Sequence, residues 1–169
     1  MAPFIGNDIP ADVFRRLVDE AYSTFRHDAV TPLRQLGADD WLLDLAQGPT
    51  LAFKDLAMQL LGNLFEYALG RSGSALNILG ATSGDTGSAA IEAVRDRRTI
   101  DIFMLHPRGR VSEVQRRQMT TVLAPNVHNI AVQGTFDDCQ DLAKACFNDL
   151  AFRDRHALTA VNSINFARV

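Results

Sequence analysis

Lys54 is the residue in this chain best suited to covalent chemistry. The chain has fifteen arginines and only two lysines, Lys54 and Lys144. Lys54 lies in the segment 48–55 (GPTLAFKD), among apolar residues and at the expected start of a helix. An arginine stays charged at any useful pH, whereas a partly desolvated lysine can lose its proton and form a Schiff base. Lys54 is therefore the first candidate for a nucleophile.

A second segment, 80–87 (GATSGDTG), joins an expected buried strand to an expected helix. Backbone N–H groups at such a helix start, with the hydroxyls of Ser83 and Thr86, form a site suited to an anion. The spacing does not fit a Walker loop, a nucleophile elbow or a dinucleotide fingerprint. Alone, the segment is equally well explained as a tight strand-to-helix turn that needs glycines. Paired with Lys54, it indicates a functional site.

A third segment, 162–168 (NSINFAR), supplies further polar groups. Asn162, Ser163 and Asn165 offer neutral donors, and Arg168 adds a guanidinium. This combination suits a phosphate dianion. The alternative is an Asn-rich cap on a following helix.

The elements that must position these residues follow an alternating pattern. Apolar runs and helical spacing predict strands at 75–79, 100–105, 126–132 and 157–161, and helices at 86–94, 111–123 and 136–152. Strands that alternate with helices of this length predict βαβ crossovers and a parallel sheet. The fold class is therefore α/β, with a Rossmann-like parallel sheet flanked by helices over residues 73–169.

Residues 1–72 form a helical segment that carries the lysine. We expect a helix over 10–25 capped by Asp8, an extended segment at 30–33 and a short strand at 41–45. A longer helix over 53–69 is expected to stop at Gly70.

Composition excludes several functional classes. The chain is 47% hydrophobic and 22% charged, as in globular proteins, and its net charge of −3 gives no general attraction for nucleic acid or membranes. No apolar run approaches the roughly 18 residues of a membrane span, and no secretory signal is visible. We expect a cytoplasmic enzyme or binding domain with a small-molecule ligand.

Metal binding is not expected. The histidines show no ligand spacing, and Cys139 and Cys146 suit two buried thiols better than a metal pair. Arginines cluster at 95–98, 108–110 and 116–117. Such clusters are either a solvated surface or a local attraction for a phosphorylated molecule.

Taken together, the three segments and 133–140 (QGTFDDCQ) resemble the threonine synthases, pyridoxal-phosphate enzymes of the tryptophan-synthase-like superfamily (fold type II). The resemblance runs through essentially the whole chain. It implies pyridoxal 5′-phosphate as cofactor, joined to Lys54 as a Schiff base. It also implies that Lys54 shuttles protons, and that Asp85 lies beside the 3′ oxygen of the cofactor, where related enzymes have Asn.

The resemblance also implies two parts of a substrate site. Ser83, Gly84, Thr86 and Gly87 are expected to hold the substrate carboxylate. The polar residues of the 162–168 segment, namely Asn162, Ser163, Asn165 and Arg168, are expected to hold the phosphate of O-phosphohomoserine. The implied reaction converts O-phosphohomoserine and water to threonine and phosphate.

Several departures from the family pattern accompany this resemblance. Gln47 and Phe166 stand where the family usually has His and Trp. Family members are much longer and carry a C-terminal glycine-rich loop for the cofactor phosphate, and these 169 residues contain no second such loop. We therefore expect a piece of a threonine synthase that alone turns over little or nothing. The sequence leaves the oligomeric state open.

Two other functions remain open at this point. One is a related enzyme such as a threonine or serine dehydratase or a sulfhydrylase; a dehydratase would have no substrate phosphate for the 162–168 segment to bind. The other is a non-catalytic α/β module that binds a small anion at 80–87 and does not need Lys54.

Overall fold

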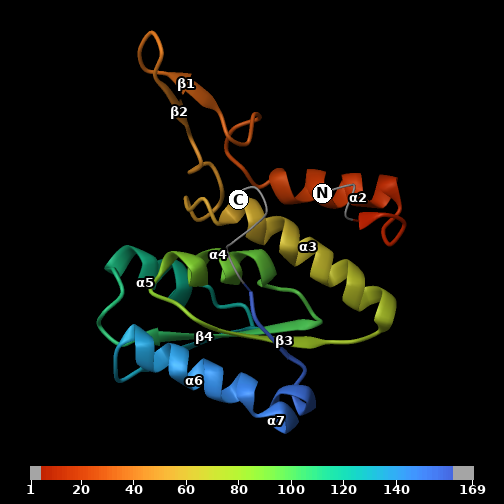
Figure 1. Ribbon diagram of the computed structural model, residues 1–169, viewed down its shortest axis with the longest axis vertical. Coiled ribbons are helices and arrows are strands. Elements are labelled where there is room, and N and C mark those ends of the chain that lie inside the picture. The colour runs from red at the N-terminus through yellow and green to blue at the C-terminus, as the bar shows by residue number, and fades with distance from the viewer. Residues whose placement is uncertain (1–4, 162–169) are drawn as a thin grey trace.

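A four-stranded parallel sheet with helices on both faces forms the centre of the computed structural model, which describes residues 5–161 (Figure 1). The elements in chain order are α2 (Ala11–Tyr22), β1 (Leu33–Gln35), β2 (Trp41–Leu43), α3 (Asp55–Ser72), β3 (Leu76–Ala81), α4 (Asp85–Val94), β4 (Ile100–Pro107), α5 (Glu113–Thr120), β5 (Val127–Val132), α6 (Phe136–Asn148), α7 (Leu150–Arg155) and β6 (Leu158–Thr159).

The sheet has the strand order β5-β4-β3-β6, and every pairing in it is parallel. Helix α4 connects β3 to β4, and α5 connects β4 to β5. Parallel strands need such crossovers, so the alternating pattern of the sequence leads directly to this sheet. The predicted α/β fold is confirmed. Because all strands run the same way, the loops after β3 and β4 lie at one edge.

The two faces of the sheet bury different side chains because successive strand residues point to opposite sides. Ile78, Ile102 and Met104 pack in a cluster with side chains from α3, α4 and α5. Leu79 and Leu105 face the other way and pack with Cys139 of α6 and its neighbours. In Figure 1, α4 and α5 accordingly lie on the opposite side of the sheet from α6 and α7.

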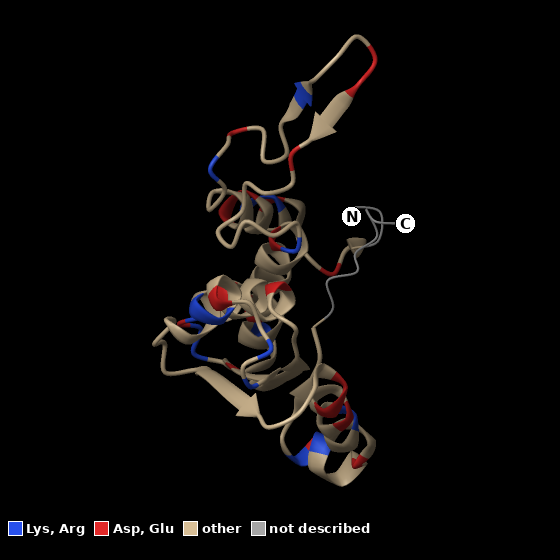
Figure 2. Cartoon of the chain, turned by 90° about the vertical axis from the view of Figure 1, so that its left-hand side faces the viewer, with Lys and Arg blue, Asp and Glu red and all other residues tan. Residues whose placement is uncertain are grey.

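The N-terminal part adds a helix pair and a hairpin. Leu17 and Ala21 of α2 bury their side chains against Leu60 of α3. Strand β2 lies within the strand predicted at 41–45, but its antiparallel pairing with β1 was not predicted from the sequence pattern. Their hairpin stands away from the rest of the molecule (Figure 2), and Trp41 is 54% exposed.

Several helix boundaries differ from the predicted ones. Helix α3 continues through Gly70 to Ser72, and it is Gly73 that adopts the left-handed conformation, with φ of 64°. Helix α2 begins after Pro10 with no side-chain cap, so Asp8 does not cap it. The predicted helix over 136–152 is two helices. Asp149 leaves the helical conformation, and its carboxylate accepts a hydrogen bond from the Phe152 N–H, which starts α7.

Candidate active site

The loop of residues 48–54, hereafter the lysine loop, is fixed by the buried carboxylate of Asp55. This side chain is fully buried, and it accepts hydrogen bonds from the Thr50 N–H (2.8 Å) and the Thr50 hydroxyl (2.7 Å). Burial raises the pKa of the Asp55 carboxyl, and the bonds from Thr50 and Ala52 oppose that rise. A buried carboxylate needs such partners. The residue after Lys54 therefore sets the path of the chain before it.

Two backbone features show how closely this loop is folded. A Cβ atom on Gly48 would overlap the Asp55 side chain, so only glycine allows this approach. Leu51 has a φ of 63°, in the left-handed region that a residue with a branched side chain rarely adopts. Such conformations persist only where the surroundings hold them, and they are frequent at functional sites.

Lys54 lies at the start of α3 and reaches Asp85 at the start of α4. Its Nζ lies 2.5 Å from Asp85 Oδ2, and also 4.6 Å from the centre of the Phe53 ring. The Lys54 side chain is only 12% exposed, whereas that of Asp85 is 40% exposed. The lysine amine is thus partly desolvated and placed at the edge of the sheet where β3 ends, the edge at which α/β proteins bind ligands.

The electrostatics of the pair act on Asp85. Partial burial acts to raise the pKa of Asp85, but the hydrogen bond and charge of Lys54 and the N–H groups of Asp85 and Thr86 outweigh it. The pKa of Asp85 is therefore below its ordinary value of 3.8. The carboxylate is ionised at neutral pH and occupies the N-terminal end of α4.

The glycine loop, residues 80–87, is organised by Thr82. Its side chain is buried, and its hydroxyl oxygen accepts hydrogen bonds from the N–H groups of Gly84 (3.0 Å) and Gly87 (2.9 Å). These two N–H groups therefore bond within the loop. The hydroxyl-bearing Ser83 is exposed and Thr86 is half-buried.

The structure brings together two of the predicted site residues, Lys54 and Asp85, and places Ser83 and Thr86 in the same loop as Asp85. The carboxylate-binding role of this loop stays a prediction. The N–H groups of Gly84 and Gly87 could bind the substrate carboxylate only by giving up their hydrogen bonds to Thr82. The predicted phosphate-binding residues, Asn162, Ser163, Asn165 and Arg168, lie outside the described residues.

Sequence reasoning missed three residues that shape the site. Thr82 and Asp55 stand inside the motifs but had been given no role. A hydroxyl two residues before a glycine and an acid directly after the lysine are the signals that could have identified them. Gln118, whose side chain bonds the lysine loop from α5, has no signal in the sequence, since it lies 68 positions away from its partner Thr50.

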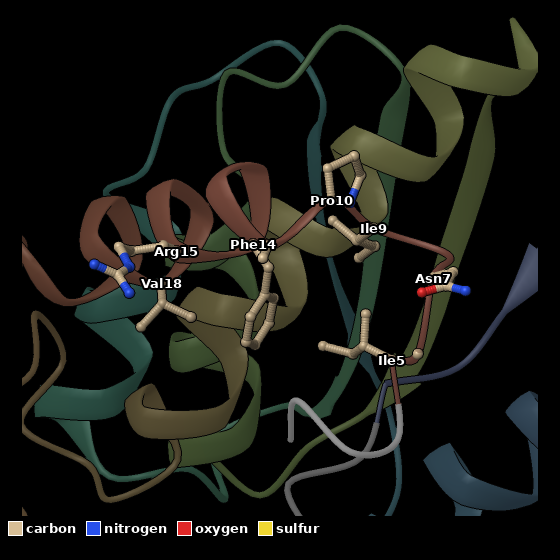
Figure 3. Close-up of a pocket in the computed structure, with 9 residues that line it drawn as sticks. Ile5, Asn7, Ile9, Pro10, Phe14, Arg15 and Val18 are labelled. Carbon is tan, nitrogen blue, oxygen red and sulfur yellow. The ribbon is translucent and has the colours of Figure 1, made fainter.

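Two cavities lie away from Lys54. One, of about 540 Å³, lies between residues 5–11 and helix α2, where Ile5, Phe14 and Val18 line it (Figure 3). The other, of about 370 Å³, lies between the sheet and α6 and α7, and Phe103, Leu142 and Phe152 are among its mostly apolar lining residues. Neither is lined by Lys54 or Asp85, so neither coincides with the candidate site.

Two further absences hold for residues 5–161. No group of three or more His, Cys, Asp or Glu side chains there is arranged to hold a metal ion. No helix in this part of the chain has the length and apolar character needed to cross a membrane.

The parallel sheet and the lysine at the start of α3 define the class of the protein, the α/β fold of fold type II pyridoxal-phosphate enzymes. The crystal structure of a PLP-bound threonine synthase from Brucella melitensis matches with a TM-score of 0.93 and 57% identity, over 99% of this chain and 36% of that chain. Yeast threonine synthase matches with a TM-score of 0.87 and 48% identity, over 96% of this chain and 34% of that chain.

The sequence comparison identifies the particular relatives. A threonine synthase from Pseudomonas aeruginosa is 56% identical over 169 residues, which is all of this chain and 36% of that protein. The chain is therefore homologous to threonine synthases along its whole length, and it spans about a third of theirs. No family model matches the chain.

Proposed function

We propose that this chain supplies the lysine-bearing part of a threonine synthase, which converts O-phosphohomoserine and water to threonine and phosphate. The observation that carries the proposal is the partly buried amine of Lys54 at 2.5 Å from Asp85, at the end of β3. The homology to threonine synthases supports the reaction, and the PLP-bound relative from Brucella melitensis supports the cofactor.

The residues present fit pyridoxal 5′-phosphate. A cofactor aldehyde needs a lysine amine that is shielded from water but still reachable, and Lys54 is 12% exposed. The neighbouring Asp85 and the N-terminal end of α4 supply polar groups beside the amine. When bound, the cofactor acts as an electron sink for carbanions formed on the substrate.

Each of the predicted site residues then has a distinct task. Lys54 would hold the cofactor covalently, and its amine, once released, would move protons at Cα and Cβ of the substrate. The hydroxyls of Ser83 and Thr86 would bind the substrate carboxylate. The residues of the 162–168 segment would bind the substrate phosphate, which departs from Cγ before water adds at Cβ.

Positioning of the reacting groups also contributes to catalysis. Asp55 holds the lysine loop by two hydrogen bonds from Thr50, and Thr82 holds the glycine loop by two from Gly84 and Gly87. Holding a reactive group in place raises its effective concentration. In favourable cases this lowers the activation barrier by about 7 kcal/mol or more.

Ligand binding tests the proposed substrate. The chain is loaded with pyridoxal phosphate, and the absorbance change of the cofactor is titrated with O-phosphohomoserine, homoserine and serine. We expect O-phosphohomoserine to bind at least about tenfold more tightly than homoserine, since the phosphate adds charge-assisted bonds. The substitution Arg168→Ala should remove that preference, and Arg155→Ala, at an exposed arginine of α7, should not.

The same titration separates the alternatives. Serine and homoserine binding as tightly as O-phosphohomoserine would favour a dehydratase. Anion binding that survives Lys54→Ala unchanged would favour a non-catalytic module.

We also expect the 169 residues alone to form little or no threonine, and formation at a normal rate would contradict that expectation.

A further inference from the structure

Helix α5 contacts both loops of the candidate site with one of its faces. The residues involved are Gln115, Gln118 and Met119, which lie three and four positions apart and therefore on the same side of a helix. The opposite side of α5 is polar, with the exposed Glu113 bonded to its neighbours Arg116 and Arg117. Helix α5 was predicted from the sequence only as a crossover between two strands.

Gln118 bonds the lysine loop. Its Nε2 donates a hydrogen bond of 3.0 Å to the Thr50 carbonyl oxygen, and its side chain is half-buried. The N–H and hydroxyl of Thr50 already donate to Asp55. All three polar groups of Thr50 are therefore satisfied, one of them from α5 and two from the residue that follows Lys54.

Gln115 and Met119 pack against the glycine loop. A Cβ atom on Gly84 would overlap the Gln115 side chain, and a Cβ on Gly87 would come within 2.8 Å of the Met119 sulfur. The side-chain carbonyl oxygen of Gln115 accepts a hydrogen bond of 2.8 Å from the Ser112 hydroxyl, which fixes its orientation. Met119 is fully buried, so this contact is part of the packed core.

We infer that α5 sets the separation of the two loops, with Gln118 as the positioning residue that holds the lysine loop against it. The inference rests on the proposed function for the role of Lys54. Lys54 and Asp85 meet across these two loops, and α5 contacts both of them. Loss of the Gln118 bond should leave the sheet intact and loosen residues 50–54.

Hydrogen exchange on the full chain without cofactor tests the positioning directly. The substitution Gln118→Met keeps the side-chain length and removes the donor. Gln35→Met is the matched control, because Gln35 also donates to a backbone carbonyl, that of Ala38 at 3.2 Å, in the distant hairpin. We expect the amides of Thr50 and Leu51 to exchange at least about fivefold faster in Gln118→Met, and those of β3 and β4 to stay unchanged.

A second readout connects the loop to the lysine. Each variant is incubated with a limiting concentration of pyridoxal phosphate and reduced with borohydride, and the label on Lys54 is measured by mass spectrometry. Gln118→Met should reduce that label at least about fivefold, and Gln35→Met should not change it. If Gln118→Met does not fold, Gln118→Asn, whose amide is one methylene too short to reach Thr50, is measured in the same way.

The outcomes separate this inference from the proposed function. Exchange and labelling in Gln118→Met that both stay within twofold of the unsubstituted chain would overturn the inference. Faster exchange with unchanged labelling would overturn the positioning role. If the unsubstituted chain is not labelled at Lys54, the proposed function fails, and the exchange of residues 50–54 still decides whether α5 holds the lysine loop.

Discussion

Lys54 Nζ and Asp85 Oδ2 lie 2.5 Å apart although 31 positions separate the two residues in the chain. Each stands at the start of a helix, Lys54 before α3 and Asp85 at the beginning of α4. The two helices pack against each other over the same face of the sheet, since Met58 of α3 and Ile91 of α4 share one core cluster. This packing places the lysine amine beside the glycine loop.

The ion pair predicts a specific pH dependence. The pKa of Asp85 is lowered in the folded chain, so the carboxylate contributes stability above its ordinary value of 3.8 and loses it as the pH falls through the lower folded-state pKa. With Asp85 40% exposed, we expect Asp85→Asn to cost less than about 1 kcal/mol at pH 6.

Urea unfolding of the unsubstituted chain and of Asp85→Asn, at pH 6 and near pH 3, measures this difference. The difference in the free energy of unfolding between the two chains should shrink at the lower pH. Asp141→Asn is the matched control, because it removes an exposed carboxylate that is paired with Lys144, and it should cost less than Asp85→Asn at pH 6. A cost of Asp85→Asn that grows towards pH 3 would contradict the assigned ion pair.

The buried Asp55 carboxylate should stabilise the fold through Thr50. Asp55→Ala leaves the Thr50 N–H without its acceptor, and we expect a loss of about 2 kcal/mol in the free energy of unfolding. Thr50→Val removes only the hydroxyl bond and should cost about 1 kcal/mol. A double-mutant cycle measured by urea unfolding should show a coupling of about 1 kcal/mol. Additive losses would mean that the two residues do not interact.

Two glycines in helices should respond to alanine in opposite directions. At Gly87 a Cβ would meet Thr82 at 2.5 Å and the Met119 sulfur at 2.8 Å, so Gly87→Ala should destabilise the chain by about 2 kcal/mol. At Gly70 no atom lies within 4 Å, so Gly70→Ala should stabilise it by about 0.5–1 kcal/mol through helix propensity.

Thermal unfolding of the two variants is the measurement. A Gly87→Ala chain that melts at or above the temperature of the unsubstituted chain would show that Thr82 and Met119 do not enclose this position. The Gly70→Ala chain serves as the control, because it makes the same chemical change in α3, outside the site.

Much of the fold could be predicted because its signals are local. Apolar runs such as that of β4 and the alternation of strands with helices depend only on neighbouring residues, and they led to the parallel sheet. Lys54 was recognisable from its residue type and setting, and Asp85 from the resemblance of its segment to a motif of the threonine synthases. Helix ends were less predictable: Gly70 and Gly73 both suit a helix end, and α3 ends at the second of them.

The rest depends on contacts between distant residues. The bond from Gln118 to Thr50 and the packing of Met119 on Gly87 join elements far apart in the sequence. The antiparallel pairing of β1 with β2 was missed because both strands have only three residues, too few for a clear pattern. The Thr82 hydroxyl accepts hydrogen bonds from the Gly84 and Gly87 N–H groups because of the geometry of the turn. The composition of the segment does not specify that geometry.

The most direct test of the central claim is reduction with borohydride in the presence of pyridoxal phosphate, followed by peptide mass spectrometry. Lys144 is an internal control, because it is 65% exposed on α6 and paired with Asp141 at 3.1 Å. The account predicts a label concentrated on Lys54, and its loss in Lys54→Arg, which keeps the positive charge but lacks a nucleophilic amine. A label shared evenly between Lys54 and Lys144 would contradict the assignment of Lys54 as the cofactor lysine.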